Sequence, residues 1–279
     1  MLEIKDFYKI DDKIYVYQNM FNDQYFIECF NYITELKDLW KKWHIFGEQL
    51  NFPFVKTTPE SSFQAMQYED FKKDIKFDSE SDEKIKYFYN YIEDVFYATT
   101  KEYFKNPGIK QPDGLKKFHH TPSLMKYVPN LDFDVLTMRH HVDFQQELIG
   151  VPSDKFLLTC NMYLNDNYKG GEVSFKVFKN NLNESNDDFD HYLYTPKMGD
   201  VVVFPSNAPY YHGVRPTING VKYFVRSFYM YEDPGSQEWH ANKEKYGEET
   251  WLQMEKLRQE EERKSGIYIK DRWDKPNYV

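Results

Sequence analysis

The run Lys155-Phe-Leu-Leu-Thr-Cys-Asn-Met-Tyr-Leu164 is mostly apolar, and polar turn residues bound it on both sides. Three more runs of the same kind follow it, namely Val173-Ser-Phe-Lys-Val-Phe178, Val201-Val-Val-Phe204 and Val221-Lys-Tyr-Phe-Val-Arg-Ser-Phe-Tyr-Met230. Short apolar runs at such close spacing are typical of a β-sandwich or a β-barrel. The sequence therefore predicts a mainly β core over residues 123–232.

Two amphipathic helices are predicted ahead of this core, after a short strand over residues 13–17. Asn22 is the expected N-cap of the first helix, and Ser79 or Ser81 is that of the second. Apolar residues recur every three or four positions along both segments and form one stripe on each: Phe26, Phe30, Ile33 and Leu36, then Ile85, Phe88, Ile92 and Val95. Both helices are interpreted as packing elements.

We predict one domain over residues 1–279, because no repeat or flexible linker divides the chain. Its parts are an N-terminal helical and mixed support region over 1–122, the β core over 123–232, and a charged helical extension over 233–279. Within the extension, residues 248–264 are dense in charge, which is typical of a largely solvated helix. The polar segment 179–190 is expected to be a hairpin loop or an insertion.

The composition limits the class of protein. The 279 residues are 41% hydrophobic and 19% aromatic, as in a globular chain whose core is rich in Tyr and Phe. The net charge of −9 opposes unspecific binding to phosphate backbones, so nucleic acid is a disfavoured partner. Cys29 and Cys160 are expected to be buried thiols, and no long apolar stretch or signal pattern is present. A cytoplasmic protein with no membrane partner is predicted, and its oligomeric state is left open.

The chemistry is predicted to lie at Arg139-His-His-Val-Asp143. His141 and Asp143 are two residues apart, so they project to the same face if the segment is a strand, whereas His140 faces the other way as a supporting residue. A β fold can bring His212 opposite this pair. Two histidines and one carboxylate with open positions form the facial triad of non-haem Fe(II) oxygenases. An isolated His-x-Asp pair is weak evidence, because hydrogen-bonded polar pairs are common in ordinary proteins.

Further motifs follow the pair in a fixed order: Gly170-Gly-Glu-Val-Ser-Phe175, Pro196-Lys-Met-Gly-Asp-Val-Val-Val-Phe-Pro205, Tyr211-His-Gly-Val-Arg-Pro216 and Gly220-Val-Lys-Tyr-Phe-Val-Arg226. In this order and spacing the sequence resembles the Fe(II)/2-oxoglutarate dioxygenases of the prolyl 4-hydroxylase type. The resemblance covers residues 127–231, and residues 17–33 match only loosely. It implies a double-stranded β-helix, which is the jelly-roll or cupin-like arrangement of two facing sheets.

The resemblance also implies the metal centre and its cofactors. His141, Asp143 and His212 match the iron ligands of the family. The co-substrate 2-oxoglutarate would chelate Fe(II) through its keto oxygen and C1 carboxylate, and one position would remain for O₂. Ascorbate is a further candidate cofactor.

Four more residues match positions around the co-substrate. Lys222 is the first candidate for the distal C5 carboxylate, and Arg226, on the same strand face, is the second because its planar fork can grip a carboxylate. Tyr163 matches a tyrosine that donates to the same carboxylate, and Tyr127 matches one that lines the pocket near the metal. With 24 tyrosines in the chain, both also suit a purely aromatic core.

The implied reaction is hydroxylation of a C–H bond with release of succinate and CO₂, since Asp143 is retained. A peptidyl proline or another protein side chain is the expected substrate, but the same core also serves nucleobases and small metabolites. Base modification would require a basic groove, and Lys116, Lys117 and Arg139 are too few to predict one. A non-catalytic cupin-like metal-binding module is the alternative from another class, against which stands the complete set of candidate ligands and cations.

Overall fold

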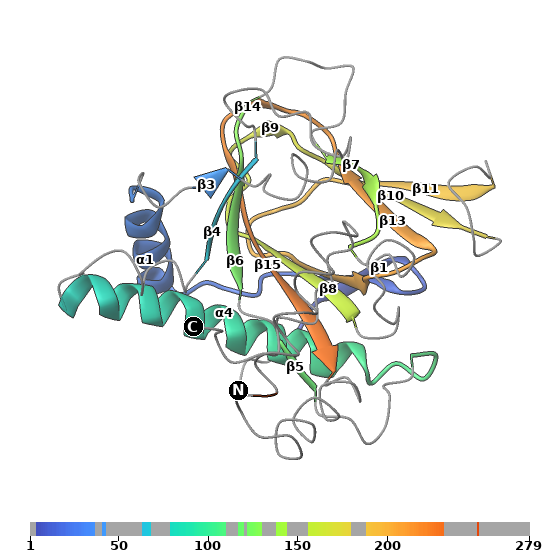
Figure 1. Cartoon of the computed structure of the whole chain (residues 1–279), viewed down its shortest axis with the longest axis horizontal. Coiled ribbons are helices and arrows are strands. Elements are labelled where there is room, and N and C mark those ends of the chain that lie inside the picture. The colour runs from blue at the N-terminus through green and yellow to red at the C-terminus, as the bar shows by residue number, and fades with distance from the viewer. Residues whose placement is uncertain are drawn as a thin grey trace.

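The structure is a computed structural model, and it describes residues 4–36, 41–42, 63–67, 79–109, 117–119, 122–129, 138–143, 156–179, 188–231 and 250. In these residues the chain is mainly β, with its helices at the periphery (Figure 1). The predicted C-terminal helix and the greater part of the 233–279 extension lie outside the described residues. None of the described helices is long and apolar enough to cross a membrane.

Nine strands form the large sheet, in which every pairing is antiparallel. In order across the sheet they are β1 (Phe7–Asp11), β2 (Ile14–Tyr17), β12 (Val201–Pro205), β8 (Phe156–Tyr163), β15 (Lys222–Tyr231), β6 (Ser123–Tyr127), β4 (Phe63–Gln67) and β3 (Lys41–Lys42), and β5 (Lys117–His119) also pairs with β15.

The smaller sheet has four antiparallel strands, β11 (Phe189–Tyr194), β10 (Val173–Phe178), β13 (Tyr210–Val214) and β7 (Met138–His141). A separate short pair joins β14 (Thr217–Asn219) to β9 (Lys169–Gly170). The register Phe178↔Phe189 makes β10 and β11 a hairpin, as predicted for the 179–190 segment, whose residues 180–187 lie outside the described part.

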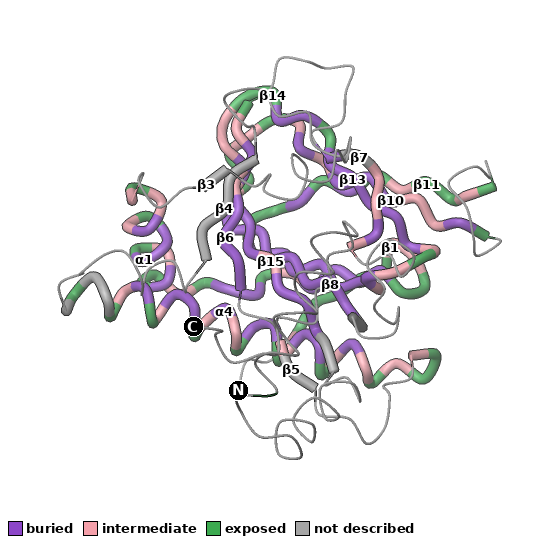
Figure 2. Tube along the Cα trace, in the orientation of Figure 1, coloured by how far each residue is buried: buried purple, intermediate pink, exposed green. Residues whose placement is uncertain are grey.

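The two sheets share a buried core. One cluster combines Val16 and Tyr163 of the large sheet with Val173 and Phe175 of the small one. Figure 2 shows this burial running along the strands where the sheets face each other. The predicted double-stranded β-helix with flanking helices is therefore confirmed.

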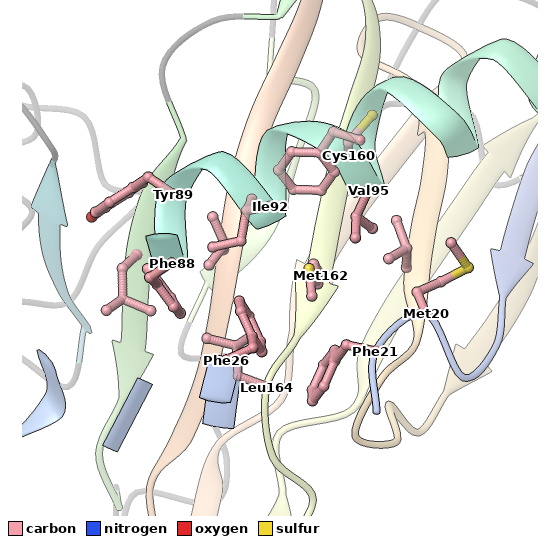
Figure 3. Packing of buried hydrophobic residues seen from close by; sticks show 14 of the residues in the cluster. Met20, Phe21, Phe26, Phe88, Tyr89, Ile92, Val95, Cys160, Met162 and Leu164 are labelled. Carbon is pink, nitrogen blue, oxygen red and sulfur yellow. The ribbon is translucent and has the colours of Figure 1, made fainter. Parts of the chain in front are cut away.

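Two helices cover the outer face of the large sheet, α1 (Gln24–Thr34) and α4 (Ser79–Tyr103). Apart from Leu36, the residues of their predicted stripes are buried, and Phe26 stacks on Phe88 with ring centroids 5.1 Å apart. Figure 3 shows residues of both stripes, Phe26, Phe88, Ile92 and Val95, against Cys160 and Met162 of β8. Both cysteines are free and buried, as predicted. Because strand residues alternate between faces, Thr159, Asn161 and Tyr163 of β8 face the small sheet.

The predicted helix starts need correction. Asp23, not Asn22, caps α1, because Asp23 Oδ1 accepts a hydrogen bond from the Phe26 amide at 2.8 Å. Leu36 lies beyond the end of α1 at Thr34 and is only partly buried. The described part of α4 begins at Ser79, so Ser81 lies inside the helix rather than at its cap.

Candidate active site

Strand pairing in the small sheet brings the two predicted histidines together. His212 on β13 lies directly opposite His141 on β7, and their ring centroids are 4.4 Å apart. β7 ends at His141, so the expectation that Asp143 shares a strand face with it was wrong. The bend after the strand returns the carboxylate to the site instead. Asp143 Oδ1 lies 3.7 Å from His141 Nε2, and Oδ2 lies 3.5 Å from His212 Nε2.

One ligand atom from each of His141, Asp143 and His212 can be chosen so that all three lie within 4.8 Å of one another. Among the residues that the structure describes, no other group of three His, Cys, Asp or Glu side chains meets this condition. Two imidazole nitrogens and one carboxylate on one face of a metal suit Fe(II), because the remaining coordination positions stay open for other ligands. The donor set therefore fits a non-haem iron centre.

The charges of these side chains also suit a metal. Burial favours a raised pKa for Asp143, but His212, His141 and Arg226 outweigh it and hold the pKa of this carboxyl well below its usual range. Burial lowers the pKa of His212 to about 3. An anionic carboxylate and a neutral imidazole are the forms that bind metals without first losing a proton.

Two further side chains hold Asp143 in place. The fully buried Thr159 hydroxyl donates to Asp143 Oδ2 at 2.6 Å, and its oxygen also lies 2.9 Å from the Ser206 hydroxyl. Arg226 Nη1 lies 3.5 Å from Asp143 Oδ1. Thr159 was not among the predicted site residues, although the period of two along β8 places it on the same face as Tyr163.

A pocket extends from the histidines into the space between the sheets. Its lining residues are Tyr127, Met138, His141, Asn161, Tyr163, Val173, His212, Val214, Lys222, Phe224 and Arg226. The structure thus brings Lys222, Arg226, Tyr163 and Tyr127 to one cavity with both histidines of the predicted triad.

Lys222 is 1% exposed, and its Nζ donates to the Gly171 carbonyl at 2.5 Å. Burial lowers its pKa to about 7. In the described part of the chain, no carboxylate forms an ion pair with it. The carbonyl belongs to Gly171, which directly follows β9. Gly170 and Gly171 both have positive φ angles, and a Cβ on Gly170 would clash with the Pro216 carbonyl.

Tyr163 and Tyr127 are each 2% exposed and pack against Phe224 with ring centroids 6.0 Å and 5.5 Å away. Lys222 Nζ lies 4.9 Å from the centre of the Tyr163 ring. Burial raises the pKa of both phenols, so each keeps its proton and can donate a hydrogen bond.

His140 does not line the pocket. Its Nε2 lies 2.8 Å from the Ser174 hydroxyl, whose oxygen is 2.7 Å from His191 Nε2. His119 lies against α4, with Nε2 3.0 Å from the Thr100 hydroxyl. His44, His120 and His240 are outside the described residues.

Comparison with known proteins defines the class. Residues 135–230 match the model of the 2OG-Fe(II) oxygenase superfamily. No curated protein matches the sequence. Together with the triad, the match shows that the chain carries a 2OG-Fe(II) oxygenase domain and is an oxidoreductase, so the predicted resemblance is confirmed. The family implies Fe(II) and 2-oxoglutarate as cofactor and co-substrate.

Similar solved structures include a prolyl hydroxylase from Trichoplax adhaerens in complex with a hypoxia inducible factor oxygen degradation domain peptide fragment. It is 14% identical, has a TM-score of 0.50, and the match covers 78% of this chain and 84% of that one. A Pseudomonas putida prolyl-4-hydroxylase is 14% identical with a TM-score of 0.47, covering 79% and 93%. A viral collagen prolyl hydroxylase from Paramecium Bursaria Chlorella virus-1, in complex with 2OG, is 14% identical with a TM-score of 0.42, covering 80% and 97%. The first of these supports the assigned fold.

Proposed function

We propose that the protein is an Fe(II)- and 2-oxoglutarate-dependent dioxygenase that hydroxylates a C–H bond of a peptidyl proline or another protein side chain. Succinate and CO₂ would be the other products. The observation that carries the proposal is that the two histidines of the His-Asp-His group line one pocket with the buried Lys222.

His141, Asp143 and His212 would hold the iron, which with 2-oxoglutarate supplies the activation of O₂. The protein's own part begins with Thr159, whose hydroxyl fixes the rotation of the Asp143 carboxylate. Partners of this kind orient a metal ligand and are often needed for full metal affinity. The apolar wall of Met138, Val173 and Val214 would exclude water from the centre.

Lys222 would bind the C5 carboxylate of 2-oxoglutarate. A buried ammonium without an anionic partner is unfavourable, and a carboxylate beside it would restore its charge. The ring centres of Tyr163 and Tyr127 lie 4.9 Å and 5.8 Å from Lys222 Nζ, so Tyr163 would contribute its hydroxyl and Tyr127 would line the same end. Arg226 already faces Asp143 and lies over the Phe228 ring, 4.8 Å from its centre, which favours Lys222 for this role.

A protein or peptide substrate is supported by two facts. The Trichoplax adhaerens structure of similar fold holds a peptide, which is a property of that protein and a guide for this one. The net charge of −9 disfavours nucleic acid substrates. Of the basic residues considered for a groove, Lys116 and the side chains of Lys117 and Arg139 are outside the described part of the chain.

The test is release of succinate from 2-oxoglutarate by the purified protein in air, with and without Fe(II), and with a panel of prolyl peptides. We expect iron-dependent turnover that Asp143→Ala abolishes. Asp190→Ala removes an exposed aspartate outside the pocket and should keep the wild-type rate. Calorimetric titration with 2-oxoglutarate under nitrogen, using Mn(II), tests binding separately. No binding by the wild type would favour the non-catalytic metal-binding module.

A further inference from the structure

Asn161 is a buried polar residue of the pocket wall that the proposed function does not use. It is 7% exposed and lines the cavity together with His141 and His212. Among the residues that the structure describes, its Oδ1 has no hydrogen-bond partner. A buried carboxamide left in this way destabilises the folded chain, so a residue without a polar function here would be expected to be apolar.

The strand fixes where along the pocket this side chain lies. Thr159, Asn161 and Tyr163 alternate with outward-facing residues on β8, so all three face the small sheet. Thr159 contacts Asp143 of the triad, while Tyr163 lies beside Lys222. Asn161 therefore lies between the metal end and the lysine end of the pocket.

The neighbouring strand gives the same placement. In the β8–β15 register, Asn161 is opposite Arg226 and Tyr163 is opposite Phe224. Arg226 faces Asp143, so its cross-strand partner is also near the metal end. The pocket lining also includes the apolar side chains of Met138, Val173, Val214 and Phe224.

We propose that Asn161 binds the co-substrate, with its Nδ2 donating a hydrogen bond to the C1 carboxylate of 2-oxoglutarate, the end that chelates the metal. This inference rests on the proposed function. A 2-oxoglutarate molecule that reaches from the triad to Lys222 passes Asn161. The oxygens of its metal-chelating end can only accept hydrogen bonds. The carboxamide of Asn161 can supply the donor, because rotation about χ2 exchanges the positions of its oxygen and its nitrogen. The bond would fix the orientation of the carboxylate as it chelates the metal.

The test is Asn161→Leu, which keeps the approximate volume and removes the amide. Two measurements are made: thermal unfolding without ligand, and calorimetric titration of the Mn(II)-loaded protein with 2-oxoglutarate under nitrogen. We expect the unfolding temperature to stay level or rise, because an unpaired polar atom is removed. Affinity for 2-oxoglutarate should fall at least about tenfold, as expected when a hydrogen bond to a charged group is lost.

Asn165→Leu is the matched control, because this amide is fully engaged. Asn165 Nδ2 donates to the Val221 carbonyl at 2.7 Å, and its Oδ1 accepts from the Tyr223 amide at 2.8 Å. The same substitution there should lower the unfolding temperature, because two partly buried backbone groups lose their partners. Asn161→Asp keeps the shape but opposes the ligand with a like charge, so it should bind more weakly still.

The outcomes separate the two proposals. If wild-type protein binds 2-oxoglutarate and Asn161→Leu binds it equally well, the role of Asn161 is wrong while the proposed function stands. A fall in unfolding temperature matching that of Asn165→Leu, with affinity unchanged, would make Asn161 a structural residue. If the wild type itself does not bind, the proposed function fails, and this inference with it.

Discussion

Lys222 and Arg226 lie on one strand but meet different partners, and this difference predicts which of them binds the distal carboxylate. Lys222→Met removes the charge and keeps most of the side-chain volume. We expect affinity for 2-oxoglutarate to fall about ten- to a hundredfold, since a charge-assisted hydrogen bond contributes about 1.5–3 kcal/mol. Calorimetric titration with Mn(II) under nitrogen measures the change. Arg226→Met should cause the smaller loss, because its guanidinium faces Asp143. The opposite order would assign the carboxylate to Arg226.

Among the helices and strands, the N-cap of α1 gives the clearest prediction about stability. Asp23 accepts hydrogen bonds from the Phe26 amide at 2.8 Å and from the Tyr87 hydroxyl at 2.9 Å, so it also ties α1 to α4. We expect Asp23→Ala to lower the free energy of unfolding by about 1–2 kcal/mol. Urea denaturation provides the measurement. Asn22→Ala should change little, because Asn22 is exposed and does not cap the helix. Equal losses in the two variants would contradict this assignment of the cap.

The same helix shows what sequence alone could and could not predict. Its apolar stripe was predictable because burial selects residues at helical spacing, and Phe26, Phe30 and Ile33 are buried. The cap was not, because Asn22 and Asp23 are both good capping residues and only the backbone decides. Asp23 has the extended conformation of an N-cap, with φ −76° and ψ 118°.

The strands, like the helix, were predictable from the sequence only in part. Their apolar runs were recognisable, and the ordered motifs identified His141, Asp143 and His212 as a set. The roles of Thr159 and Asn161 were not predictable, because each is one polar residue within an apolar run. Their importance appears only when β8 is placed beside β15 and the bend at Asp143.

For the whole molecule, the large sheet joins the support region to the site. Strand β2 from the N-terminal region pairs with β12 of the core, and β4 pairs with β6. The outward residues of β8 pack under the helices, while the inward ones reach the pocket. This arrangement supports the proposal of one domain, in which α1 and α4 hold the sheet that carries Thr159, Asn161 and Lys222.

The burial of Lys222 should make the stability of the ligand-free protein depend on pH. In the folded chain its pKa is lowered to about 7 by burial, whereas in the unfolded chain it should be near the ordinary 10.5. Between these values the unfolded chain binds more protons at this position. The free energy of unfolding therefore rises with pH across the interval, by up to about 1.4 kcal/mol per pH unit from this group.

Lys222→Met removes the titrating group. Comparing this variant with the wild type therefore isolates the contribution of Lys222 to the pH dependence of stability. The free energy of unfolding of the wild type minus that of Lys222→Met, measured by urea denaturation at a series of pH values, should increase as the pH rises from about 7 towards 10.5. Saturation with Mn(II) and 2-oxoglutarate should flatten the wild-type dependence, because a carboxylate beside Lys222 restores the pKa of its ammonium. If the difference between the ligand-free proteins did not change with pH, Lys222 would have an ordinary pKa in the folded chain. The electrostatic argument for an anion at this position would then fail.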